Sequence, residues 1–173
     1  AEDDPSGPLL QFSLLVLDDV ALTGIANDLA TQWRQYGVEV NVDSTDQAEY
    51  DMRLESGEFD AVIAEASLMG SADPDVYAFW HQGQFPDGLN YGGVNDTLIS
   101  ELLERARSDA NGTNRQIHYA EFQQEFIGRA IAIPLYSPLF TYAVSSRVDG
   151  VQLGYMSSLT DRYLSLSDWQ ISP

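Results

Sequence analysis

The chain has 173 residues, of which 44% are hydrophobic, so it is long enough to bury the core of about one domain. Its 27 acidic residues outnumber 8 basic ones, all arginine, and the formal net charge of −19 makes nucleic acid and anionic membranes improbable partners. The absence of cysteine excludes a disulfide framework, a thiolate metal site and a cysteine nucleophile. The acidic, lysine-free composition fits either adaptation to high salt or an extracellular protein from a GC-rich genome.

The hydropathy pattern shows neither a membrane-spanning segment nor a signal peptide. No apolar run approaches the ~20 residues that are needed to cross a bilayer. The first eight residues, AEDDPSGP, contain neither the basic nor the apolar region of a signal peptide. We expect residues 1–8 to be disordered or an end segment.

The first part of the chain predicts alternating strands and helices. Residues Leu9–Leu17 form a nearly continuous apolar run, which is typical of a strand covered on both faces. Apolar side chains recur every three or four positions over Leu22–Tyr36, and this predicts an amphipathic helix that Gly37 ends. Apolar and polar residues then alternate over Val38–Val42, which predicts a strand with one buried face and one solvent-exposed face.

A second helix and strand follow at once. Asp46 and Glu49 have the spacing of a capping pair, which predicts a short helix as far as Leu54. The stretch Phe59–Ala64 reads as a buried strand that runs directly into a loop of small and polar residues. In open α/β sheets, ligands bind outside the carboxyl ends of the strands, so this loop is a candidate binding region.

The second half of the chain predicts two long helices and then two strands. The helices are expected at Asp96–Ser108, for which Asn95 is the expected N-cap, and at Asn114–Ile127. The strands are expected at Ala130–Tyr136 and Phe140–Ser145, and a proline at position 134 favours an edge or a bulge in the first of them.

Several motifs between these elements resemble one known family. In order along the chain they are Asp73-Pro74-Asp75, Asn90-Tyr91-Gly92-Gly93, Asp96-Thr97-Leu98-Ile99, and Arg115 to Tyr119 with Gln123. In sequence and spacing they resemble family 5 of the extracellular solute-binding proteins, the dipeptide- and oligopeptide-binding group of ABC importers. Full members of this family run to several hundred residues in two lobes, so the chain resembles most of the C-terminal half, mainly one lobe.

The resemblance implies a fold and a domain organisation. The expected fold class is α/β, a periplasmic-binding-protein-like lobe of type II with a mixed sheet flanked by helices. The lobe is expected over residues 9–147. Residues 148–173, which show no strong period, are expected to form an irregular tail that returns toward the other lobe.

The resemblance also implies a function, which is the capture of a small solute such as a peptide or oligosaccharide for import. The implied partners are this solute, the N-terminal lobe of the same protein and an ABC permease in the membrane. We expect a monomer that is extracellular or periplasmic, with a possible lipid anchor upstream of this sequence. No enzyme activity, cofactor, metal or nucleic-acid partner is expected.

The predicted ligand-binding residues come from the strand end, the aromatic cluster and the glycine-rich turn. They are Ser67, Leu68, Met69, Gly70, Trp80, His81, Asn90 and Tyr91. Structural roles compete with binding at three of these positions, because an aromatic ring can close the core beneath a loop and a histidine can cap one. Trp80, His81 and Tyr91 are the residues for which these roles stay open.

The resemblance further predicts the class of ligand. In peptide-binding members, an aspartate three residues before the Asp-Pro turn forms a salt bridge with the free amino terminus of the peptide, and a tryptophan commonly stands three residues earlier. Counting back from Asp73, Gly70 and Ser67 occupy these positions here. A buried ammonium without its counter-ion is costly. We therefore expect a ligand whose binding does not require a free α-amine.

Other classes of protein fit the sequence less well. Asp18 and Asp19 follow the first strand, as in the receiver domain of a response regulator, which is the alternative function. However, Glu65 stands where a receiver has its phosphoacceptor aspartate, and the chain has no lysine to contact a phosphoryl group. The two histidines, His81 and His118, are far apart in sequence, and neither a G-x-S-x-G elbow nor an H-E-x-x-H helix is present.

Overall fold

The computed structural model describes residues 7–68, 73–137, 139, 141–154, 156 and 158–172. The chain divides into two compact units. Unit 1 comprises Ala1–Ala66 and Gln82–Asn95, and unit 2 comprises Ser67–His81 and Asp96–Pro173. Within the described ranges, no helix combines the length and the apolar character that a membrane crossing requires.

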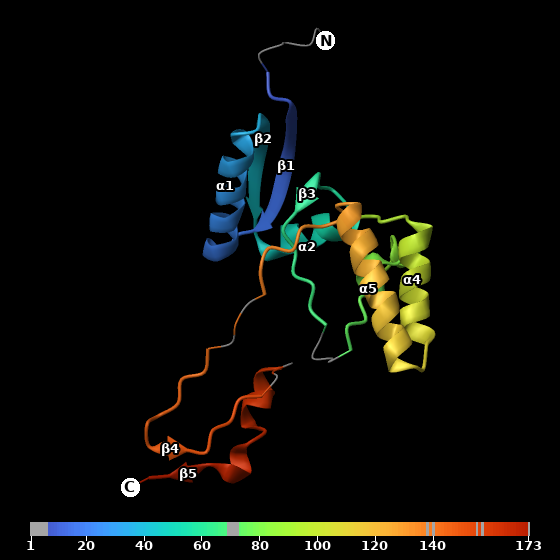
Figure 1. Cartoon of the computed structure of the whole chain (residues 1–173). Coiled ribbons are helices and arrows are strands. Elements are labelled where there is room, and N and C mark those ends of the chain that lie inside the picture. The colour runs from blue at the N-terminus through green and yellow to red at the C-terminus, as the bar shows by residue number, and fades with distance from the viewer. Residues whose placement is uncertain are drawn as a thin grey trace. The chain divides into compact units, whose positions relative to one another are not determined.

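Unit 1 is built on a parallel three-stranded sheet with the strand order β2-β1-β3 (Figure 1). The strands are β1 (Leu10–Leu17), β2 (Val38–Thr45) and β3 (Ala61–Val62). Helix α1 (Val20–Arg34) connects β1 to β2, and helix α2 (Gln47–Ser56) connects β2 to β3. This order of strands and helices confirms the alternation that the sequence predicts.

Strand β1 is covered on both faces, as its apolar run predicts. Successive side chains of a strand point to opposite faces, so neighbouring residues enter different cores. Leu14 and Val16 pack in a cluster with residues of α1, whereas Leu15 packs with Tyr50 and Leu54 of α2. Leu15 and Val16 are both fully buried, with exposed fractions of 0%.

The helix ends of unit 1 follow from local side-chain chemistry. The Asp19 carboxylate accepts hydrogen bonds from the backbone N–H groups of Ala21 (2.9 Å) and Leu22 (3.0 Å) and so caps α1. Asp46 caps α2 in the same way, through a bond from the Glu49 N–H at 3.0 Å. Gly57 ends α2 with a φ of 73°, a left-handed conformation that residues with a Cβ seldom adopt.

Unit 2 is centred on a helical hairpin formed by α4 (Thr97–Ser108) and α5 (Gly112–Gly128), with the short helix α3 (Tyr77–Trp80) against it. Figure 1 shows α4 and α5 side by side. Their shared core consists of buried residues from both helices: Ile99, Leu102, Leu103, Ala106, Tyr119 and Phe122. The two helices confirm the prediction of two long helices in this part of the chain.

The end of the chain contains little regular structure. Two-residue strands β4 (Val148–Asp149) and β5 (Gln170–Ile171) pair antiparallel, and 3-10 helices span Leu159–Tyr163 and Leu166–Asp168. Trp169 donates its indole N–H to the Ser165 hydroxyl at 3.0 Å, and this bond stabilises the 3-10 helix at Leu166–Asp168.

Two predicted strands are not formed in the structure. Residues 130–136, and the described part of 140–145, belong to no strand. Residue Ala130 has a φ of 51°, so the chain leaves α5 through a left-handed residue and not through extended backbone. A strand also requires partners for its backbone groups, and none of the described residues of unit 2 forms a backbone hydrogen bond with residues 132–136.

The start of α4 differs from the prediction by one residue, because Asp96 and not Asn95 is its N-cap. The Asp96 carboxylate accepts a hydrogen bond from the Ile99 N–H at 3.0 Å, and the Arg129 Nε atom donates to its other oxygen at 2.7 Å. Both contacts lower the pKa of the Asp96 carboxyl below its usual value, and the backbone bond from Ile99 has the larger effect. The cap thus joins the beginning of α4 to the end of α5.

We expect Asp96→Ala to lower the free energy of unfolding at pH 7 by about 1 kcal/mol, the usual effect of a lost N-cap. Because the folded pKa of Asp96 lies below the unfolded one, its carboxylate stabilises the fold fully above pH ~4 and loses this effect as pH falls through the folded pKa. Urea unfolding at several pH values should show the wild-type and variant curves converging in acid.

Asp87→Ala is a matched control for this experiment, because Asp87 is exposed and makes no side-chain hydrogen bond or ion pair with any residue that the structure describes. We expect it to change the free energy of unfolding by less than about 0.5 kcal/mol. A difference between wild type and Asp96→Ala that is the same at every pH would contradict the capping role of the carboxylate.

Candidate functional site

The loop that follows β3 begins at a firmly fixed strand end in unit 1. The Ile63 N–H donates to the Leu15 carbonyl at 3.0 Å, which extends the pairing of β3 with β1 by one bond. The Tyr50 hydroxyl donates to the Ile63 carbonyl at 2.8 Å, and burial of this hydroxyl raises the pKa of Tyr50. The next residues, from Ala64 to Ala66, are exposed. The carboxyl end of β3 is therefore anchored where the predicted binding loop starts.

The loop itself reaches unit 2 at Ser67. Ser67 is exposed and Leu68 is half-buried. The other two predicted residues of this stretch, Met69 and Gly70, lie outside the described residues.

Two arginines fasten the acidic turn that comes after this loop, within unit 2. The Arg115 Nη2 atom lies 2.5 Å from Asp73 Oδ1 and 2.7 Å from Asp73 Oδ2. The Arg107 Nε atom lies 3.0 Å from Asp75 Oδ2, and Asp75 Oδ1 accepts from the Tyr77 N–H at 3.1 Å. These contacts fix the turn to α4 and α5. The hydrogen bond between Arg115 and Asp73 raises the pKa of the Arg115 guanidinium.

Trp80 and His81 lie at the end of α3 and pack into unit 2. The Trp80 ring meets the Phe126 ring edge to face at a centroid distance of 4.7 Å, and Trp80 stays half-buried. The His81 ring is stacked on the Tyr77 ring at 4.1 Å, and its Nε2 atom lies 3.0 Å from Glu104 Oε1. With an exposed fraction of 7%, His81 has the contacts of a residue that ties the α3 turn to α4.

Sequence reasoning missed Tyr77 and Glu104 as the neighbours of His81. Tyr77 precedes His81 by four residues, a spacing that brings two side chains together on a helical turn. No sequence signal could have pointed to Glu104, because it comes from another helix and is one of many acids. Tyr77 and Glu104 also line an open depression of about 440 Å³ on unit 2, together with Arg107 and Ser108.

Asn90 and Tyr91 lie in unit 1, on the glycine-rich turn. Asn90 is 1% exposed and bonds the same residue twice: its Nδ2 atom donates to the Val94 carbonyl, and its Oδ1 atom accepts from the Val94 N–H, both at 2.9 Å. This side chain therefore closes the turn that contains Gly92 and Gly93. Tyr91 is half-buried and packs beside the cluster of Leu15, Tyr50 and Leu54.

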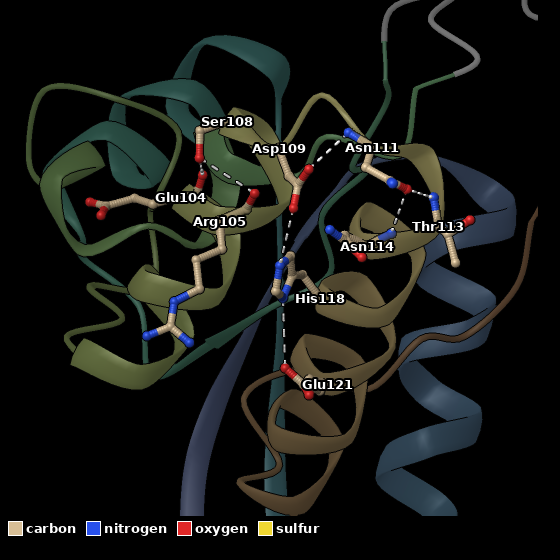
Figure 2. Close-up of polar contacts among 9 residues, drawn as sticks. All are labelled: Glu104, Arg105, Ser108, Asp109, Asn111, Thr113, Asn114, His118 and Glu121. Atoms are coloured by element: carbon tan, nitrogen blue, oxygen red, sulfur yellow. Dashed lines mark hydrogen bonds and ion pairs between the residues drawn. The ribbon is translucent and has the colours of Figure 1, made fainter.

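The other histidine, His118, belongs to a polar group at the α4–α5 turn (Figure 2). Its Nε2 atom lies 3.8 Å from Asp109 Oδ2, and its Nδ1 atom lies 3.8 Å from Glu121 Oε2. Asp109 also accepts a hydrogen bond from the Asn111 N–H at 2.8 Å. This bond is the main cause that lowers the pKa of the Asp109 carboxyl, and a hydrogen bond from the Asn114 side chain is the second.

This group at the turn has the features of a helix cap. Figure 2 shows the Asn111 side chain accepting from the backbone at the start of α5. No set of three histidine, aspartate or glutamate side chains in the described residues could bind a metal ion.

Asp18 and Asp19, the acidic pair that resembles a receiver domain, both accept hydrogen bonds within unit 1. Asp19 is the N-cap of α1. The other carboxylate, Asp18, accepts a hydrogen bond from the Ser44 hydroxyl of the neighbouring strand at 3.3 Å.

Comparison of the sequence finds no matching family model and no matching curated protein. Comparison of the structure finds the oligopeptide-binding protein AppA of Bacillus subtilis in complex with a nonapeptide, with a TM-score of 0.71 and 18% identity over 100% of this chain. It also finds HbpA2 of Haemophilus parasuis, with a TM-score of 0.73 and 20% identity over 98% of this chain. A third match is NikZ of Campylobacter jejuni in complex with Ni(L-His), with a TM-score of 0.66 and 17% identity over 92% of this chain.

These likenesses establish the fold class. The chain is α/β, with a parallel sheet flanked by helices, and it has the fold of the type II periplasmic-binding proteins, as the resemblance implied. It spans about a third of the length of the three solved structures, namely 35%, 33% and 33% of their chains.

We expect Asn90→Ala to lower the free energy of unfolding of the chain by about 1–3 kcal/mol, because it removes two hydrogen bonds and leaves both polar groups of Val94 without that partner. Thermal unfolding followed by circular dichroism would measure the loss. Asn95→Ala is the matched control, because Asn95 is exposed and its side chain forms no hydrogen bond within the described part of the chain. Equal effects of the two substitutions would show that the Asn90 side chain does not fix the turn.

Proposed function

We propose that this chain is a lobe of a family 5 extracellular solute-binding protein, and that the whole protein captures a small solute for import by an ABC permease. The observation that carries the proposal is the likeness of fold, which extends over 92–100% of the chain in the three solved structures above. The ordered series of family-like motifs in the sequence also supports it.

The neighbouring structures contain chemically different ligands. The AppA structure is a complex with a nonapeptide, and the NikZ structure is a complex with Ni(L-His). The same fold therefore accommodates both a long peptide and a metal chelate, and fold alone cannot select the solute. The proposal for this chain is accordingly a small solute of peptide, oligosaccharide or similar type.

The predicted binding residues divide into two kinds by their burial, and we propose a role for each kind within its own unit. Trp80 in unit 2 and Tyr91 in unit 1 are half-buried, so part of each ring is available to stack on a solute. Ser67 and Leu68 would contribute contacts at the strand end. His81 and Asn90 are buried, and their role would be to position the neighbouring aromatic residue.

The proposed partners follow from the same class of protein. They are the solute, the other lobe of the same polypeptide and a membrane permease, with closure of the two lobes as the implied mechanism. The proposed location is extracellular or periplasmic, with a lipid anchor upstream of this sequence as one means of attachment, and the proposed state is a monomer.

The test of this function compares the 173-residue chain with the full-length protein. Mass spectrometry of solute copurified with the full-length protein identifies the ligand, and calorimetry then measures its affinity for both proteins. We expect the 173-residue chain to bind at least roughly 100-fold more weakly, because each tenfold loss needs only about 1.4 kcal/mol of missing contacts. Equal affinities would place the whole site within these residues and refute closure of two lobes.

A second measurement addresses the ligand class, for which we propose that a free α-amine is not required. Gly70, at the position of the amine-binding aspartate, has no side chain with which to pair an ammonium group. We expect a peptide and its N-acetylated form to bind the full-length protein within about threefold of each other, which corresponds to less than 1 kcal/mol. A loss of tenfold or more on acetylation would contradict this proposal, and a panel of oligosaccharides tests the uncharged alternative.

A further inference from the structure

Two stretches of the sequence have the pattern Asn-x-Thr, which is the acceptor pattern for N-linked glycans in secreted proteins. They are Asn95-Asp96-Thr97, at the start of α4, and Asn111-Gly112-Thr113, at the start of α5. Both asparagines are exposed, so exposure alone does not distinguish them. Because so short a pattern also occurs by chance, the structure around each asparagine decides whether it can react.

The side-chain amide of Asn111 uses only its oxygen in the fold. Asn111 Oδ1 accepts hydrogen bonds from the backbone N–H groups of Thr113 (2.9 Å) and Asn114 (3.3 Å) and so caps α5 (Figure 2). Among the described residues, none accepts a hydrogen bond from Asn111 Nδ2. An N-linked glycan is attached to this nitrogen, and the oxygen remains an acceptor after attachment. The cap and a glycan are therefore compatible on one side chain.

The first turn of α5 can also open without disturbing the core of unit 2. Residues 111–114 are all exposed, and the first buried residue of α5 is Tyr119. Gly112 occupies the first helical position, and glycine is among the weakest helix formers. A helix end with few buried contacts frays at little cost in free energy. A modifying enzyme can thus take residues 111–113 into its own acceptor site.

The first turn of α4, where the other acceptor pattern lies, is held in place. Ile99 and Ser100 belong to this turn and are only 0% and 3% exposed. Asp96, the middle residue of the pattern, caps α4 and accepts a hydrogen bond from Arg129 Nε at 2.7 Å. Withdrawal of residues 95–97 from the fold would break this cap and disturb the core. The two patterns therefore differ in their accessibility to a modifying enzyme.

We propose that Asn111 is a site of N-linked glycosylation and that Asn95 is not. In the reaction, Asn111 Nδ2 loses a proton and forms a bond to the anomeric carbon of a sugar chain carried on a polyprenyl phosphate or diphosphate. The bond between that carbon and a phosphate oxygen breaks, and the lipid phosphate leaves with the electron pair. The inference rests on the proposed function in one respect, the extracellular or periplasmic location, because N-linked glycans are found on secreted proteins.

Glycopeptide mass spectrometry of the full-length protein from its natural source tests the proposal. Trypsin cleaves after Arg107 and Arg115, and this releases Asn111 in the short peptide 108–115. We expect this peptide to carry a glycan that fragmentation assigns to Asn111, and the pattern at Asn95, released by a second protease, to be unmodified. A peptide 108–115 without a glycan, or with Asn111 only deamidated to aspartate, would overturn the proposal.

Variants of the full-length protein in the same host separate the glycan from the helix cap. Asn111→Asp keeps an oxygen that can cap α5 and removes the nitrogen, so the glycan should be lost. Thr113→Ala should also lose it, whereas Thr113→Ser retains the hydroxyl of the pattern and should keep it. Asn95→Gln is the matched control and should leave the glycan unchanged. A glycan that persists in Asn111→Asp would contradict the assignment.

A stability measurement shows that such a loss is not a failure to fold. In full-length protein produced without glycosylation, Asn111→Asp should leave the Tm within roughly 2 °C of the wild type, because aspartate and asparagine are equally good N-caps. Asn111→Ala, which removes the capping oxygen, should lower the Tm further than Asn111→Asp does. Equal effects of the two substitutions would contradict the separate roles of Oδ1 and Nδ2.

The results also distinguish the modification from the transport function. A glycan on Asn111 of a protein that binds no solute would support the modification and contradict the proposed function. Solute binding by an extracellular protein whose peptide 108–115 is unmodified would support the function and overturn the modification. Equal occupancy of Asn95 and Asn111 would overturn the distinction between the first turns of α4 and α5.

Discussion

Burial of β1 on both faces is the constraint on which the rest of unit 1 depends. Because Leu14 and Val16 enter one core and Leu15 the other, α1 and α2 must cover opposite faces of the sheet. Covering both faces leaves the two ends of the strands as the places where loops emerge. The loop after β3 emerges there, and Tyr91 from the glycine-rich turn packs on the same core as Leu15. The position of a candidate binding residue therefore follows from the hydrophobic pattern of one strand.

Unit 2 positions its candidate residues by a different combination of forces. The core of α4 and α5 provides a rigid hairpin, and polar contacts then attach the irregular segment to it. Asp73 and Asp75 are each paired with an arginine, and His81 is stacked and hydrogen-bonded at the end of α3. Exposed ion pairs contribute little stability individually, but several on one short segment restrict its conformations. Such a segment can carry binding side chains although its helix, α3, has only four residues.

The sequence predicts the elements of this fold well where local chemistry decides them. Asp46 and Gly57 delimit α2 through a cap and a left-handed residue, and both signals are legible in the sequence. The candidate site is less predictable, because its environment comes from tertiary contacts. The environment of His81 depends on Glu104 of a different helix, and no local spacing identifies that one acid among 27. Burial of Asn90 likewise depends on how its own turn folds back to Val94.

The segment after α5, where the predicted strand is not formed, shows why a strand is harder to predict from a local pattern than a helix. Helical hydrogen bonds are satisfied within one segment, so a helix such as α5 is specified by its own residues. A strand is specified only together with its neighbour, because its backbone groups need partners from elsewhere. Residues 131–136 have the pattern of an edge strand, with proline at position 134, but the structure forms no strand there. A local pattern therefore specifies the helix α5 more completely than it specifies a strand.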